Sequence, residues 1–106
     1  MKLPKTIKIA NHVFNVDEWN SNEASAHGRF GECDCNTLSI RISTAHPDSH
    51  IRETLMHEIL HAIFWSYGVK DIDDEERTIT GLAVGLSQVW QDNPKLYKQI
   101  FGDQHD

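Results

Sequence analysis

The sequence predicts an α+β fold, in which a small antiparallel sheet from the first half of the chain precedes helices from the second half. Three observations predict this class. Short alternating apolar stretches lie before residue 44, two long stretches with helical apolar spacing lie after residue 47, and turn-forming residues separate them. The chain has 106 residues, enough to bury one modest core, so residues 1–106 are expected to form a single domain.

Two antiparallel β-hairpins are expected in the first half. One joins KTIKIA to VFNV through Asn11-His12, and the other joins ECDC to LSIRIS through Asn36-Thr37. Residues 17–27, DEWNSNEASAH, are polar and show no clear period, so we expect a loop there with at most a short helical turn. In LSIRIS the residues alternate as in a half-buried strand, with Leu38, Ile40 and Ile42 on one face and Ser39, Arg41 and Ser43 on the other.

The stretch HIRETLMHEILHAIFWSY is expected to form the central helix. Pro47, Asp48 and Ser49 give a start signal, and Gly68 gives a stop signal. A helix that is apolar on nearly every side is buried, and this one is expected to be buried. Its apolar residues form two groups on the helical wheel: Ile51, Leu55, Ile59, Ala62 and Ile63 on one broad face, and Leu60 and Phe64 on the other side.

A second helix is expected from Asp73 to about Asp92, and a short C-terminal helix, PKLYKQIF, follows Asn93-Pro94 and is closed by Gly102. Gly81 and Gly85 weaken the second helix by about 1 kcal/mol each relative to alanine, but they permit close approach of another helix. The final GDQHD is expected to fray. The apolar stripe of the second helix consists of Ile79, Leu82, Ala83, Leu86 and Val89.

Composition and charge exclude several classes of function. The net charge is −6 and no Lys/Arg cluster is present, so the phosphate backbone of a nucleic acid is not an expected partner. No apolar run approaches the roughly 18 residues that a membrane helix needs, and the N-terminus has no signal-peptide core. Cys33 and Cys35 are expected to be reduced, because a disulfide across one residue would be strained. These features favour a cytoplasmic protein that binds neither nucleic acid nor membrane.

The stretch MHEILHA carries the pattern H-E-x-x-H in the central helix. The spacing places His57 and His61 one turn apart on one face, where two imidazoles can meet one tetrahedral Zn²⁺ ion. Glu58 points about 100° around the helix, where it can act as the general base toward the attacking water. The competing interpretation is two histidines that are hydrogen-bonded in the core. Burial of two imidazoles and a carboxylate together is costly without a metal or a partner, which favours the zinc site.

A catalytic zinc site needs a third protein ligand. The dense carboxylate cluster DIDDEER follows the central helix. Glu76 lies three residues before Ile79 and is preferred, and Glu75 is the alternative. Asp73 with Glu76 three residues later also resembles a capping box, so the capping and ligand roles compete for the Glu76 side chain.

These residues carry a resemblance to a known family. TLMHEILHAIF, DDEER and GLAVGLSQVWQDNP are similar to the small zincins encoded by phages and prophages, which are related to the ImmA/IrrE-type metallopeptidases on the gluzincin side. The resemblance covers roughly residues 28–95. It implies a strand before the active-site helix, His57 and His61 as ligands, Glu58 as general base and Glu76 as third ligand. It also implies a bacterial host cytoplasm as the location.

The resulting expectation is a zinc metallopeptidase that hydrolyses a peptide or protein substrate, held along the strand Leu38–Ser43 by strand addition. The alternative is a non-catalytic, zinc-stabilised phage protein that binds a partner. Cys33 and Cys35 are expected to be ordinary thiols rather than metal ligands. Four further side chains are candidates for stabilising an oxyanion, and none is preferred: Tyr67, Tyr97, His27 and His50. Three residues are expected to pack in the core: Trp19, Trp65 and Trp90.

Overall fold

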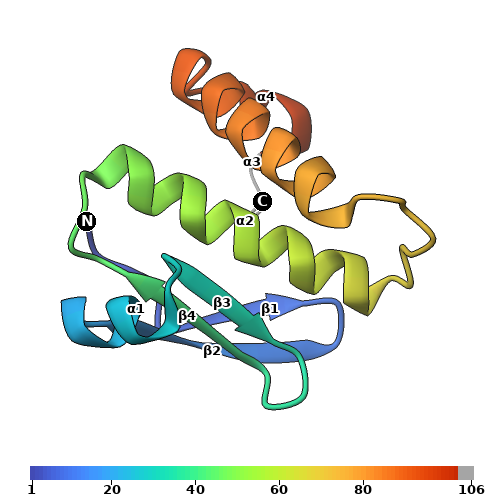
Figure 1. Ribbon diagram of the computed structural model, residues 1–106. Coiled ribbons are helices and arrows are strands. Elements are labelled where there is room, and N and C mark those ends of the chain that lie inside the picture. The colour runs from blue at the N-terminus through green and yellow to red at the C-terminus, as the bar shows by residue number, and fades with distance from the viewer. Residues whose placement is uncertain (103–106) are drawn as a thin grey trace.

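A four-stranded mixed sheet forms one layer of the protein, and the long helix α2 (Asp48–Ser66) lies across one of its faces (Figure 1). The helix α3 (Glu75–Asp92) packs on the other side of α2, so that α2 is sandwiched between the sheet and α3. The computed structural model describes residues 1–102, and the tail that was expected to fray falls mostly on residues 103–106, outside that range. The predicted α+β class is confirmed.

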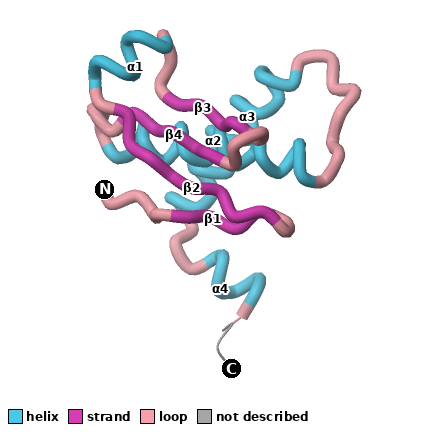
Figure 2. Tube along the Cα trace, turned by 90° about the horizontal axis from the view of Figure 1, so that it is seen from below, coloured by secondary structure: helices cyan, strands magenta, loops and turns pink. Residues whose placement is uncertain are grey.

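The sheet contains two antiparallel hairpins as predicted, although the first turns at Ala10-Asn11 and not at Asn11-His12, and the sheet is not purely antiparallel. Its strands are β1 (Thr6–Ile9), β2 (His12–Trp19), β3 (Gly31–Asp34) and β4 (Ser39–Ser43), in the spatial order β1-β2-β4-β3 (Figure 2). The hairpins β1–β2 and β3–β4 are antiparallel, whereas β2 and β4 run parallel, with Val16 opposite Ile40. β1 and β3 are therefore the edges, and β4 is an inner strand.

The position of β4 explains where the alternation prediction succeeded and where it failed. Ile40 and Ile42 are fully buried and face α2, as predicted. Ser39 and Ser43 are buried as well, because β4 has neighbours on both sides. Leu38 lies before the strand in a left-handed turn with φ of 55°, and was wrongly expected to be a strand residue.

Residues 17–27 are regular, contrary to the expected loop. β2 continues to Trp19, and α1 (Ser21–His27) follows it. Asn20 and Glu23 form a reciprocal capping box: the Glu23 N–H donates to Asn20 Oδ1, and the Asn20 N–H donates to Glu23 Oε1. α1 contains no buried residue, so its sequence shows no apolar period, and the cap is its main local signal.

The central helix α2 (Asp48–Ser66) matches the predicted one closely, and its two apolar groups contact different layers. Ile51, Leu55 and Ala62 pack with the sheet residues in the main core. Leu60 packs in a smaller cluster with Ile79 and Ala83 of α3 (Glu75–Asp92). Within residues 1–102, no helix is long and apolar enough to cross a membrane.

The second predicted helix exists, but several of its details were wrong. Its N-cap is Asp74, not Asp73, because the Arg77 N–H donates to Asp74 Oδ1 at 3.1 Å. Leu82 and Val89 were expected to be buried and are both 42% exposed. The last helix, α4 (Leu96–Phe101), is closed by Gly102 as predicted, but it starts at Leu96 and not at Pro94.

The two glycines of α3 do not mediate a close helix–helix contact. A Cβ atom added at Gly81 or at Gly85 would meet no atom within 4 Å among the described residues. Both residues are exposed on the face of α3 that points away from α2. The expectation that they permit close packing is therefore wrong for the described chain.

Candidate metal centre

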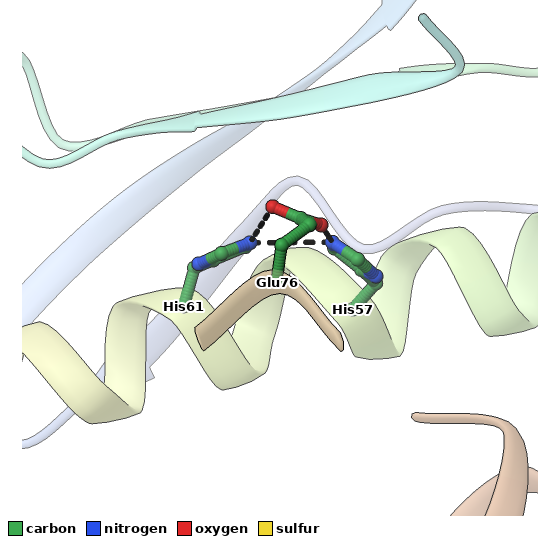
Figure 3. Close-up of side chains that lie close together, drawn as sticks. All are labelled: His57, His61 and Glu76. Carbon is green, nitrogen blue, oxygen red and sulfur yellow. Dashed lines mark hydrogen bonds and ion pairs between the residues drawn. The ribbon is translucent and has the colours of Figure 1, made fainter. Parts of the chain in front are cut away.

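The structure brings together His57, His61 and Glu76 (Figure 3). In the sequence, Glu76 follows His61 by 15 residues and His57 by 19. The histidines come from adjacent turns of α2, and Glu76 comes from the first turn of α3. His61 Nε2 lies 3.2 Å from His57 Nε2 and 3.2 Å from Glu76 Oε2. The other Glu76 oxygen, Oε1, contacts His57 Nε2. This group could hold a metal ion.

These separations fit the coordination of zinc. Bonds of about 2.05 Å at a tetrahedral angle place two ligand atoms about 3.3 Å apart. His61 Nε2 lies 3.2 Å from each of its two neighbours in the group. Two neutral imidazoles and one carboxylate are also the donor set of many catalytic zinc sites with three protein ligands. The donor set therefore suits a metal ion such as Zn²⁺, and two of the three separations match a tetrahedral site, whereas His57 Nε2 and Glu76 Oε1 lie closer together than bound ligand atoms would.

Glu75 occupies a different position from Glu76. Glu75 Oε2 lies 3.2 Å from His61 Nδ1, the ring nitrogen that faces away from the group. A carboxylate at this nitrogen accepts its proton and leaves Nε2 free to bind a metal. The geometry thus places Glu76 among the ligand atoms and Glu75 behind His61. Since Asp74 supplies the helix cap, Glu76 is not needed for capping.

Glu58 is buried beside this group, with 7% of its surface exposed. Burial raises the pKa of Glu58 to about 7, the nearby charge of His61 opposes this rise, and the charge of Glu76 adds to it. Among the described residues, no side chain forms a hydrogen bond or ion pair with Glu58. A carboxyl group with a pKa near neutrality can both accept and donate a proton at physiological pH.

The site lies in an open cleft of about 940 Å³ between β3 and the two long helices. Its walls include Glu58 and the three residues of the candidate metal group, together with both cysteines. β4 was predicted to lie at the cleft rim and to pair with a peptide. It is paired on both sides by β2 and β3, so it has no free edge and that placement is wrong.

The edge strand β3 lines the cleft instead. Ser43 N donates to Phe30 O, which makes Phe30–Ser43 a hydrogen-bonded pair of the antiparallel ladder. Because such pairs alternate, the backbone groups of Gly31 and Cys33 point away from β4 toward the free edge. The strand beside the cleft with an unpaired edge is therefore β3, not β4, among residues 1–102.

Gly31 allows β3 to lie close to α2. A Cβ atom at this position would come within 2.9 Å of both Arg41 O and Thr54 Cγ2. The strand could not approach the helix this closely with any larger residue. β3 is therefore held directly over the turn of α2 that precedes His57 and Glu58.

Two further residues of α2 line the cleft, one of them expected in the core and the other named only as one of four candidates for stabilising an oxyanion. Trp65 was expected in the core but is 47% exposed and lines the cleft. His50 also lines it, and its Nδ1 atom is buried without a hydrogen-bond partner within the described chain. Both lie on the Glu58 side of α2 at helical spacing, at positions 50, 54, 58, 61 and 65. This regular spacing is the sequence feature that places both residues on the same side of the helix as Glu58.

The other candidates for oxyanion stabilisation lie elsewhere. The His27 ring stacks on Trp19 with centroids 4.5 Å apart. Tyr67 follows α2 and is 66% exposed, while Tyr97 packs against Phe101 in α4. Of the four, only His50 lines the cleft.

Comparisons with known proteins give no match: no family model, no curated protein and no solved structure matches this chain. The assignment of the site therefore depends on the sequence pattern and on the geometry described above.

Proposed function

We propose that the protein is a zinc-dependent metallopeptidase. The observation that carries the proposal is the buried Glu58 carboxyl, unpaired among the described residues, beside a His-His-Glu group with zinc-like spacing. Burial of a carboxyl group without a partner costs free energy, so a purely structural role does not account for it. A role in proton transfer does account for it, because such a role requires a carboxyl group beside the metal with a pKa near neutrality, as Glu58 has.

In this proposal His57, His61 and Glu76 hold Zn²⁺, and Glu75 keeps His61 in the required tautomer. When bound, Zn²⁺ supplies Lewis acidity, which acidifies a water molecule and polarises a peptide carbonyl. Glu58 accepts a proton from the attacking water and delivers it to the leaving amine. The low exposure of Glu58 keeps bulk water from competing for that proton.

The substrate proposed is an extended peptide that pairs with the free edge of β3. The outward backbone groups of Gly31 and Cys33 supply one donor and one acceptor each. The open cleft admits a peptide or an unfolded loop. This replaces β4 by β3 as the docking strand and leaves the class of substrate as predicted.

The decisive experiment compares zinc content and peptide cleavage in the wild type, Glu58→Gln and His61→Ala. We expect stoichiometric zinc in the wild type and in Glu58→Gln, but about 10²–10⁴-fold slower cleavage in Glu58→Gln. His61→Ala should lose the zinc of the His-His-Glu group, and cleavage with it. Glu53→Gln, a change in the same cleft, is the matched control and should retain both.

The main alternative is a non-catalytic module that zinc stabilises for binding a partner protein. It predicts that Glu58→Gln leaves partner binding and zinc content unchanged while no peptide library is cleaved by the wild type. Wild-type protein that cannot be loaded with zinc would rule out both functions.

A further inference from the structure

Cys33 and Cys35 form a second group of metal-binding atoms in the wall of the same cleft. Their Sγ atoms lie 3.8 Å apart, and both cysteines are free. Cys33 is in β3 and Cys35 is in the turn that follows it, and both are partly buried. The candidate metal group of α2 and α3 uses neither sulfur atom.

The sulfur separation fits two bonds to one metal ion. Zinc–thiolate bonds of about 2.3 Å at a tetrahedral angle place the two sulfur atoms about 3.8 Å apart. A disulfide requires about 2.05 Å, so the sulfurs would have to move considerably to form one. The present positions of the two thiols suit a shared metal ion without rearrangement.

The electrostatic surroundings also favour a cation. Burial raises the pKa of the Cys33 thiol, and negative charges on Glu58 and Asp34 raise it further. Burial likewise raises the pKa of Cys35, with a contribution from Glu75. The charged side chains that act on the two thiols are thus all acidic. A thiophilic cation would offset the repulsion that each thiolate meets there.

We propose that Cys33 and Cys35 are two ligands of a second site, for a thiophilic cation of the zinc group such as Zn²⁺ or Cd²⁺. Binding releases one proton from each thiol to solvent, and water completes the coordination. The site is separate from the His-His-Glu group and does not depend on the proposed peptidase activity.

The test is a titration of metal-free, fully reduced protein with Cd²⁺, with a non-thiol reductant present. The thiolate-to-cadmium absorption in the ultraviolet reports the cysteine site, and native mass spectrometry counts the bound ions. We expect two ions in the wild type. In His61→Ala we expect one ion with the absorption retained, and in Cys33→Ser/Cys35→Ser one ion with the absorption lost.

Cys35→Ser alone provides a second measurement, because Cys35 lies outside β3 and its replacement leaves the strand unchanged. It should also lose the absorption while circular dichroism stays that of the wild type. The proposal is overturned if reduced wild type shows no thiolate absorption, or if Cys35→Ser retains it. A Cys33–Cys35 disulfide that survives the reductant would overturn it as well.

Discussion

At the scale of single residues, the position of Glu58 combines two requirements that normally oppose each other. Among residues 1–102 it is the one buried charged side chain, and it lies where the candidate metal group meets the cleft. Desolvation favours its neutral form, whereas the neighbouring His61 favours the charged form. Its ionisation therefore couples the chemistry of the site to the stability of the fold.

This coupling predicts a pH-dependent stability of the metal-free protein. The pKa of Glu58 is raised from 4.5 to about 7 in the folded state, so between these values the folded state binds more protons than the unfolded state. Stability should therefore fall as pH rises from about 4.5 to 7, by up to about 3 kcal/mol. Urea unfolding at pH 5 and pH 8, with a chelator present, measures this change.

Glu58→Gln is the control, because glutamine does not titrate and the other groups remain. The wild type should lose more stability than the variant over this interval. Parallel curves for the two proteins would show that Glu58 ionises normally in the fold.

The neighbouring glutamates predict different effects on metal affinity. Glu75→Ala removes the acceptor for His61 Nδ1 and should weaken zinc binding about 10- to 100-fold. Glu76→Ala removes a ligand and should weaken it more. Competition with a chelating dye measures both, and Asp73→Ala is the control. A larger effect for Glu75→Ala would reverse the two assignments.

At the scale of the elements, glycines in two different environments show that the effect of a glycine on stability depends on what surrounds it. Gly31 lies beneath a closely packed helix, whereas Gly81 and Gly85 of α3 face open space. The sequence alone does not distinguish them, since close packing depends on which surfaces meet. The two environments lead to opposite predictions.

Gly81→Ala and Gly85→Ala should each stabilise the protein by about 1 kcal/mol, because alanine favours a helix and its Cβ meets no neighbour here. Urea unfolding measures the effect. Gly68→Ala is the contrasting variant and should destabilise, since Gly68 has φ of 68°. Destabilisation by the α3 substitutions would mean that this face packs against something in solution.

Gly31→Ala should destabilise by about 1–3 kcal/mol, because the added methyl group would overlap Arg41 O and Thr54 Cγ2. Thr54→Ser removes the second of these atoms. The double variant Gly31→Ala/Thr54→Ser should therefore recover part of the loss relative to Gly31→Ala. Equal stability of Gly31→Ala and wild type would contradict the close approach of β3 to α2.

The helices and hairpins that bury apolar residues could be predicted from the sequence, and the rest could not for identifiable reasons. α2 carries apolar residues at helical spacing and strong end signals, so its limits and its two packing faces were predicted. α1 buries nothing and lacks such a period. The parallel pairing of β2 with β4 depends on how two hairpins pack, which alternation within each strand does not encode.

The candidate site also combines residues that could be predicted from one element with residues that depend on how two elements pack. His57, Glu58 and His61 could be identified because one helix holds them at fixed spacing. Glu75 and Glu76 are adjacent and both acidic, so only the packing of α3 against α2 distinguishes them. The expectation that β4 has a free edge was wrong, because the spatial order of the strands is not encoded in the alternation of any one of them.

At the scale of the whole molecule, the core is divided unequally. The sheet and α2 share an extensive apolar core, whereas α3 is held to α2 by a small cluster around Ile79 and Ala83. The candidate metal group also joins α2 to α3. A bound ion would therefore reinforce the weaker of the two interfaces.

Zinc should accordingly protect α3 more than the sheet. At a free zinc concentration of about 100 times the dissociation constant, the gain in stability is about 2.7 kcal/mol. Hydrogen exchange should slow most in Glu75–Asp92 and little in His12–Trp19. In His61→Ala, zinc should no longer slow exchange in Glu75–Asp92 more than in His12–Trp19. Uniform slowing across the wild-type chain would instead indicate that α3 unfolds only together with the sheet.

The connection between α2 and α3 has a practical consequence. Two residues of the candidate group precede the exposed stretch 67–71, and the third follows it. If the chain were cut in this stretch, a bound ion would connect the two fragments, because each fragment would supply at least one ligand. The pair of fragments 1–69 and 70–106 could then serve as a split reporter, in which reassembly measures the concentration of free zinc.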